Sequence, residues 1–306
     1  MSETTVALRG VTKRYGNQTA VADVDVSFNA GECIALVGHN GAGKSTLIKL
    51  MLGLIRASSG KVEVLGQDAG KPQATATRAD LGYLPENVVF PPAMTGRELL
   101  GFYARLKRRD VAANEGLLER VGLVHAAERR IGTYSKGMRQ RLGLAQALIG
   151  SPRLMLLDEP TTGLDPALRR TFYGIIDELA GDGVTVLLSS HALMELEPRS
   201  DRIIVMNRGR KVADGTMADL RALAHCPVRI RADFTGADKP SGNLLGNKAG
   251  WREIGDNVVE IACSELDKVA VVRRLMTLPS GPRDIDIVPP TLDDIYAHFL
   301  EREAAE

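Results

Sequence analysis

The stretch Gly38-His39-Asn40-Gly41-Ala42-Gly43-Lys44-Ser45-Thr46 decides the fold class of this chain. It follows the apolar segment 32–37 and precedes the helix-periodic segment 47–52. The order of strand, glycine-rich loop and helix is typical of a phosphate-binding loop, in which backbone N–H groups and a helix N-terminus face phosphate oxygens. A glycine-rich structural turn is the alternative, and the complete pattern G-x-x-x-x-G-K-S in this setting disfavours it. We therefore expect a nucleoside triphosphate as the first partner.

Two side chains of this loop have specific expected roles. Lys44 is expected to reach the outer phosphates, and the hydroxyl of Ser45 to ligate Mg²⁺. The other nucleotide contacts predicted within this loop are Gly38, Asn40, Gly41, Ala42, Gly43 and Thr46.

The composition is that of an ordinary globular protein of 306 residues, with 44% hydrophobic and 25% charged residues. The net charge of +1 gives no electrostatic sign of nucleic-acid binding. The N-terminus lacks a targeting pattern, and no segment is apolar for long enough to span a membrane, so we expect a cytoplasmic chain. Its three cysteines, Cys33, Cys226 and Cys263, lack metal-ligand spacing and are interpreted as reduced thiols, with Cys33 in a buried strand.

Patterning along the chain predicts two domains. Period-two alternation between Val6 and Ser27 indicates an antiparallel sheet, and apolar strands at 154–157, 184–188 and 203–206 indicate a parallel α/β core. The interval of about 87–150 is mostly helical, beginning at a capping box formed by Thr95 and Glu98. We place the domain boundary at Ala224, with a nucleotide-binding domain over 1–224 and a small α+β domain over 225–306.

A second motif puts two carboxylates, Asp158 and Glu159, at the end of the apolar strand 154–157. In such sheets the carboxyl ends of the strands lie beside the phosphate loop. We expect Asp158 to hold Mg²⁺, through water, and Glu159 to act as the general base for an attacking water. An acidic turn after a strand is the alternative, which the phosphate loop upstream disfavours.

At this point the chain resembles the ATP-binding subunits of ABC transporters. Four further elements stand in that family's order: Tyr15, the signature Tyr134-Ser135-Lys136-Gly137-Met138, Gly163-Leu164-Asp165-Pro166, and His191. The resemblance covers about residues 5–223. It implies an ABC-type nucleotide-binding domain of the P-loop NTPase class, with a RecA-like core, an antiparallel β subdomain and a helical subdomain.

The resemblance also implies roles for these residues. Ser135 and the Gly137 amide would complete the ATP site of a second subunit, so a head-to-tail dimer with two ATP molecules is expected. His191 would sense the γ-phosphate and Asp165 would lie at the dimer seam. Tyr15 would stack on adenine. For Tyr15 a core aromatic, and for His191 a structural polar residue, are the plainer alternatives.

Three positions depart from the family pattern, one of them Met138, which stands where Gln is common. Glu86 stands where a Mg²⁺-binding Gln is usual, and its carboxylate still offers an oxygen ligand. Lys136 stands where Gly is common, and either a cation near the γ-phosphate or a solvated lysine fits it.

Closer similarity runs through the segments 82–88, 104–107 and 133–148, which resemble the NosF family of ATPase subunits. That family serves maturation of the copper enzyme nitrous oxide reductase, and it implies a polytopic membrane permease and a periplasmic protein as partners. The chain would then lie at the inner face of the membrane through its permease. The apolar segment around Val89 and Phe90 is predicted to receive a permease helix, although packing inside the helical subdomain also fits it.

The cargo stays open between copper and a sulfur species, because ATPase motifs report the motor and not what it moves. An ATPase subunit of a drug or lipid exporter would share every nucleotide-site residue. A soluble ABC ATPase acting on ribosomes or DNA is a third hypothesis, which the single cassette disfavours. A regulatory nucleotide binder is disfavoured by the intact set of catalytic residues.

Overall fold

The computed structural model describes residues 3–71, 75–190, 193–234 and 250–305. The chain divides into two compact units, Met1–Thr216 and Met217–Glu306. Helix α8 (Met217–Ala224) belongs to the second unit because it packs against α10 (Leu292–Ala305). The boundary placed at Ala224 from the sequence lies one helix later than this division.

The centre of the first unit is a six-stranded sheet with the strand order β10-β9-β3-β8-β7-β6. All neighbouring pairs are parallel except β10 with β9, and the central strands are apolar because both of their faces are covered. Since β3, β8 and β7 are adjacent and parallel, the segments that follow them meet at one edge of the sheet. The strands are β3 (Cys33–Val37), β6 (Leu81–Leu84), β7 (Leu154–Asp158), β8 (Thr185–Ser189), β9 (Arg202–Asn207) and β10 (Arg210–Gly215).

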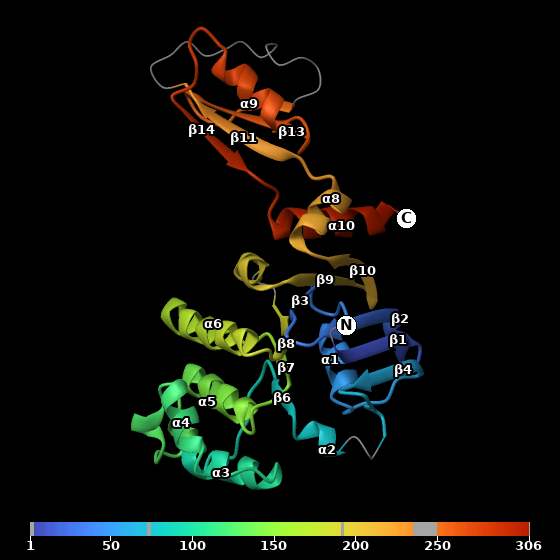
Figure 1. The fold of residues 1–306 in the computed structure, drawn as a ribbon, viewed down its shortest axis with the longest axis vertical. Coiled ribbons are helices and arrows are strands. Elements are labelled where there is room, and N and C mark those ends of the chain that lie inside the picture. The colour runs from blue at the N-terminus through green and yellow to red at the C-terminus, as the bar shows by residue number, and fades with distance from the viewer. Residues whose placement is uncertain (1–2, 72–74, 191–192, 235–249, 306) are drawn as a thin grey trace. The chain divides into compact units, whose positions relative to one another are not determined.

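The predicted antiparallel sheet is confirmed, with the order β2-β1-β4-β5. Helix α1 (Lys44–Met51) lies between the two sheets, as Figure 1 shows. Phe28, Leu47 and Leu156 belong to one buried cluster, which joins both sheets through this helix. The strands are β1 (Thr4–Tyr15), β2 (Gln18–Asn29), β4 (Ser59–Val64) and β5 (Gln67–Asp68).

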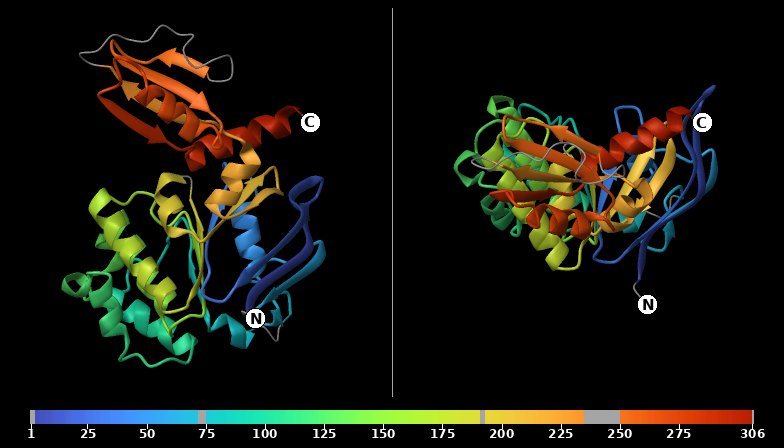
Figure 2. Two further views of the ribbon diagram at one scale, coloured as in Figure 1. Left: turned by 45° about the horizontal axis from the view of Figure 1, so that its top comes forward. Right: turned by 90° about the horizontal axis from the view of Figure 1, so that it is seen from above.

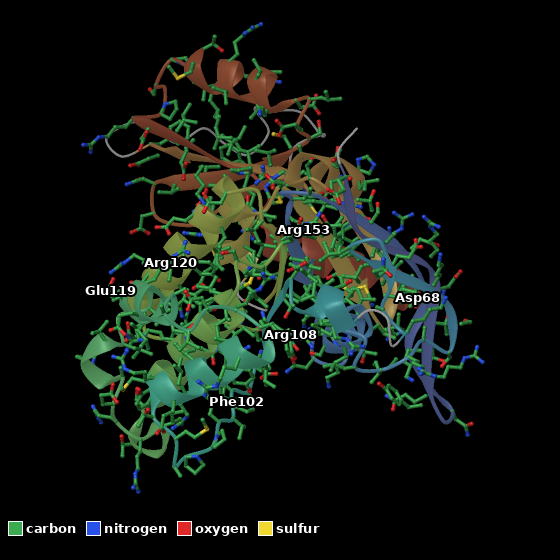
Figure 3. All side chains as sticks on the ribbon, turned by 60° about the horizontal axis from the view of Figure 1, so that its bottom comes forward. Asp68, Phe102, Arg108, Glu119, Arg120 and Arg153 are labelled. Atoms are coloured by element: carbon green, nitrogen blue, oxygen red, sulfur yellow. The ribbon has the colours of Figure 1, made fainter. Side chains whose placement is uncertain are left out.

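The interval 87–150, predicted to be mostly helical, contains several separate helices, and the first of them starts only at Gly96. The first begins at the expected capping box, in which Glu98 N donates to Thr95 Oγ1 over 3.2 Å and Thr95 N donates to Glu98 Oε2 over 2.9 Å. Arg120, labelled in Figure 3, donates to Glu178 over 2.7 Å and ties α4 to α6. The helices of this unit are α2 (Thr75–Arg78), α3 (Gly96–Leu106), α4 (Asn114–Arg120), α5 (Lys136–Leu148), α6 (Pro166–Gly181) and α7 (Leu193–Leu196), with 3₁₀ turns at Val124–Ala126, Ile131–Thr133 and Glu197–Arg199.

The second unit is the predicted small α+β fold. Its sheet has the order β12-β13-β11-β14, all antiparallel, and Figure 2 shows α9 against one face. Ile230, Ile261 and Leu275 form its core. Its carboxylate Glu260 is buried between Arg231 and Arg252. The elements not yet given are β11 (Val228–Asp233), β12 (Gly250–Glu253), β13 (Val258–Cys263), α9 (Lys268–Met276) and β14 (Asp284–Val288).

All three cysteines are free thiols, as expected. Cys33 and Cys263 are buried, whereas Cys226 is partly exposed. Burial raises the pKa of Cys33 to about 12, so this thiol stays protonated within β3. Over the part of the chain that the structure describes, no helix combines the length and the apolar character that crossing a bilayer requires.

Candidate functional site

A cavity of about 670 Å³ lies beside the phosphate loop. That volume is within the range of small-molecule binding sites. Segments that are distant in sequence meet there: the first two strands, the loop after β3, and the residues after β6, β7 and β9. The lining residues are Tyr15, Gln18, Thr19, Ala20, His39, Asn40, Gly41, Gly43, Lys44, Ser45, Thr46, Glu86, Glu159 and Arg208.

The loop that joins β3 to α1 has a backbone that requires glycine. Gly41 and Gly43 have φ values of 87° and 105°, in the left-handed region that side chains disfavour. A Cβ added at Gly43 would lie 2.6 Å from the carbonyl oxygen of Ala20, and one at Gly38 would lie 2.7 Å from that of Met206. Gly38 and the buried Ala42 therefore shape the loop without lining the cavity.

Lys44 extends back across this loop. Its Nζ donates to the carbonyl oxygen of Gly38 over 2.5 Å and lies 3.7 Å from Glu159 Oε1. Only 6% of Lys44 is exposed. The predicted phosphate-binding cation and the predicted general base thus face one another across the same cavity.

The two carboxylates after β7 have different surroundings. Glu159 lines the cavity with a positive φ of 47°, whereas Asp158 is buried and is not a lining residue. Ser189 joins them, because its Oγ donates to Asp158 Oδ1 over 2.7 Å and accepts from the amide of Glu159 over 3.0 Å. Sequence reasoning did not single out Ser189, although it stands two residues before His191.

The remaining lining residues are polar or partly exposed to solvent. Tyr15 is half-exposed, and the ammonium of Lys13 lies 4.9 Å from its ring centroid. Ser45 and Glu86 bring a hydroxyl and a carboxylate to the same cavity. The sequence did not point to Gln18, Thr19, Ala20 or Arg208, because no local motif marks them.

The signature segment is placed elsewhere in the unit. Ser135 caps α5 by accepting from Met138 N, and Asp165 caps α6 by accepting from the amides of Ala167 and Leu168. A Cβ added at Gly137 would lie 3.3 Å from Leu168, so the signature adjoins the start of α6. Ser135, Gly137 and Asp165 do not line the cavity.

The sequence allows two interpretations of Lys136, as a cation near the γ-phosphate or as a solvated lysine. Its ammonium lies against Gly163, where an added Cβ would be 2.8 Å from Nζ. In this structure Lys136 therefore covers the turn before α6. His191, the predicted γ-phosphate sensor, falls outside the described residues.

The donor set available for a metal is small. Within the described ranges, no three His, Cys, Asp or Glu side chains form a group that could hold a metal ion. Ser45 and Glu86 each supply an oxygen donor at the cavity. Few protein ligands are enough for Mg²⁺, because substrate phosphates and water supply its other ligands.

Comparison with known proteins finds similarity to ATP-binding proteins, as the phosphate loop and its cavity indicate. The family profile described as ABC transporter matches residues 21–162. The daunorubicin resistance ATP-binding protein DrrA3 of Streptomyces coeruleorubidus is 33% identical, covering 98% of this chain and 96% of its own. The Nod factor export ATP-binding protein I of Rhizobium johnstonii is 36% identical, covering 99% and 97%.

A solved structure gives the same answer for the fold. An ATP binding subunit of an ABC transporter superposes with a TM-score of 0.68 at 30% identity, covering 72% of this chain and 92% of that one. The predicted P-loop NTPase fold is confirmed. This chain belongs to the ATP-binding proteins of ABC transporters, a family of cassettes that bind and hydrolyse ATP.

Proposed function

We propose that this chain works as a head-to-tail pair of cassettes that hydrolyse ATP at their shared interface and drive a membrane permease. One observation carries the pairing: Ser135 and Gly137 do not line the cavity that Lys44 and Glu159 share. The signature lies at the N-terminus of α5, away from the cavity of its own cassette. A helix N-terminus attracts phosphate, so we propose that this one binds a phosphate of the nucleotide held by a second subunit.

Within one cassette the lining residues divide the chemical work. Lys44 neutralises phosphate charge, and the half-exposed ring of Tyr15 offers a face to adenine. Glu159 accepts the proton of the attacking water, for which its position in the cavity and next to Lys44 is suitable. His191 is proposed to support that water and Asp165 to couple the two sites.

Mg²⁺ is proposed to bind through Ser45 and Glu86, with Asp158 acting behind them. When bound, it would neutralise phosphate charge. Ser189 holds the carboxylate of Asp158 in place through the 2.7 Å hydrogen bond. The replacement of an amide by the carboxylate of Glu86 adds a negative charge to this rim.

The permease is proposed to dock on the helical region after β6. Val89 is 87% exposed, and Phe102 on α3, labelled in Figure 3, is 45% exposed. Large apolar side chains that are exposed to water, here one in the loop before α3 and one on α3, suit burial by a partner helix. Such docking would hold the chain at the inner face of the cell membrane.

For the cargo, the names of the two relatives, which refer to daunorubicin resistance and to Nod factor export, favour export of a molecule of one of these two kinds. The similarity of segments 82–88 and 133–148 to the NosF family supports a second candidate. In that case the permease serves nitrous oxide reductase maturation by moving copper or a sulfur species, with a periplasmic protein as a further partner.

The test is co-purification of the tagged chain with its permease, followed by ATPase measurements in vesicles. Stimulation by daunorubicin or a Nod factor supports the exporter, and stimulation by Cu(I) or a sulfur donor supports the second candidate. Val89→Asp should abolish co-purification, whereas Val124→Asp, on an exposed 3₁₀ turn, should not. Unchanged co-purification of Val89→Asp would contradict the docking surface.

A further inference from the structure

The carboxylate of Glu195 on α7 holds two side chains of α6 at once. Arg169 Nη1 donates to Glu195 Oε1 over 2.8 Å, and Tyr173 Oη donates to Glu195 Oε2 over 3.0 Å. A carboxylate is acceptor-only at both oxygens, so it satisfies a guanidinium and a phenol together. Glu195 thereby fixes α7 to α6.

Arg169 carries this link to the turn that begins at Glu159. Its Nε donates to the carbonyl oxygen of Leu164 over 3.0 Å. The turn itself is closed by hydrogen bonds from Thr162 N to Glu159 O and from Leu164 N to Thr161 O. One end of the turn is therefore tied to Glu195, and the other end carries Glu159.

Tyr173 reaches the middle of the same turn. It is buried, and its hydroxyl interacts with the side chain of Thr161 in the middle of the turn. Burial raises the pKa of Tyr173 to about 12, so the hydroxyl keeps the proton that it donates to Glu195. Two independent connections thus run from Glu195 to the segment 159–164.

Arg199, in the 3₁₀ turn that follows α7, completes the cluster. Its Nη1 donates to the carbonyl oxygen of Glu195 over 3.0 Å, and its guanidinium lies 4.5 Å from the ring centroid of Tyr173. Stacking of a guanidinium on a ring limits the freedom of both groups. The position of α7 is therefore set through both the side chain and the backbone of Glu195.

From these contacts we infer that Glu195 is a positioning residue for Glu159. It holds the turn 159–164 and so aims the Glu159 carboxylate into the nucleotide cavity. This inference rests on the proposed role of Glu159 as general base. The ion pair with Arg169 is partly exposed, and such pairs add little to stability, so the effect of Glu195 is expected on turnover rather than on folding.

The test compares Glu195→Gln with Glu178→Gln in the full-length chain. The control removes the same charge from an exposed glutamate of α6 that pairs with Arg120. Because a small misplacement of a reacting group costs up to about 100-fold in rate, we expect kcat of Glu195→Gln to fall about 10- to 100-fold with KM for ATP within about twofold. Glu178→Gln should retain the kcat of the unmodified chain.

Two further variants keep the test decisive. Tyr173→Phe keeps the ring and removes one hydrogen bond to Glu195, so it should lower kcat in the same direction. Adding Glu195→Gln to Glu159→Gln should cause no further loss, because Glu195 acts through Glu159. A full additional loss, or a Glu195→Gln variant with unchanged kcat, overturns the positioning role. Full activity in Glu159→Gln alone would instead overturn the proposed general base.

Discussion

Each unit of this chain buries one glutamate among its described residues, and the two behave differently. Glu159 is 7% exposed and Glu260 is 3% exposed. Glu260 accepts from Arg231 Nε over 3.1 Å and from Arg252 Nε over 2.8 Å, within one antiparallel sheet. Glu159 faces Lys44 across 3.7 Å and lines a cavity of about 670 Å³. Burial alone therefore does not identify a catalytic carboxylate. Glu260 is buried between arginines and has a structural role, whereas Glu159 is buried but lines a cavity that can hold a ligand.

The largest expected effect is on ATP turnover. Glu159→Gln keeps the shape and removes the proton acceptor, so kcat should fall about 1000-fold while ATP binding persists. The matched Glu260→Gln should keep the kcat of the unmodified chain within about twofold. Steady-state phosphate release with purified variants measures both. Equal losses in the two variants would break the distinction between the two glutamates.

Removing the cation beside each glutamate should affect ATP binding only at Glu159, where the cation is Lys44. Lys44→Met removes a charge-assisted contact to phosphate, and we expect ATP affinity to fall about 100-fold. Lys49→Met, an exposed position on the same helix, is the control. Arg252→Met should leave affinity unchanged. Equilibrium binding of a fluorescent ATP analogue gives the three values, and tight binding by Lys44→Met would argue against its role.

The next effect is on the stability of the second unit. Glu260→Ala leaves two arginines without their shared acceptor, which should lower the free energy of unfolding by about 2 kcal/mol. Trp251, the single tryptophan, lies in β12 next to Arg252, so its fluorescence reports this unit. Glu265→Ala, at an exposed ion pair with Lys268, should cost less than about 0.5 kcal/mol. A Glu260→Ala variant as stable as this control would show that the buried carboxylate contributes nothing.

The smallest effect is a pH dependence of the same unit. Burial acts to raise the pKa of Glu260, but the hydrogen bonds and charges of Arg231 and Arg252 outweigh it and hold that pKa below its ordinary value. Its stabilisation is therefore complete above the unfolded-state pKa near 4.5 and is lost as the pH falls through the folded-state pKa. With solvent around both arginines, we expect the stability gap to Glu260→Gln to narrow by about 1 kcal/mol between pH 6 and pH 3. Urea unfolding followed at Trp251 tests this, and a constant gap would contradict it.

Local motifs account for what the sequence predicted well. The phosphate loop and the capping box at Thr95 need only partners within a few residues. Alternation of apolar residues likewise indicated the antiparallel sheet.

The parts that escaped prediction depend on contacts between segments that lie far apart in the sequence. Ser189 meets Asp158 because β8 lies between β3 and β7, which no local pattern encodes. Glu195 meets Arg169 across 26 positions of the chain. The domain division shifted to Thr216 because α8 packs with α10, which follows it only after the whole second sheet.

The unequal access of the three thiols has a practical consequence for experiments on this protein. Cys33 and Cys263 are buried within their units, whereas Cys226 is partly exposed to solvent. A maleimide dye should thus attach at one position of the native chain and at three after denaturation, as mass spectrometry would count. The natural sequence already provides a single-site label on the second unit, so its motions during ATP turnover can be followed spectroscopically without any engineered cysteine.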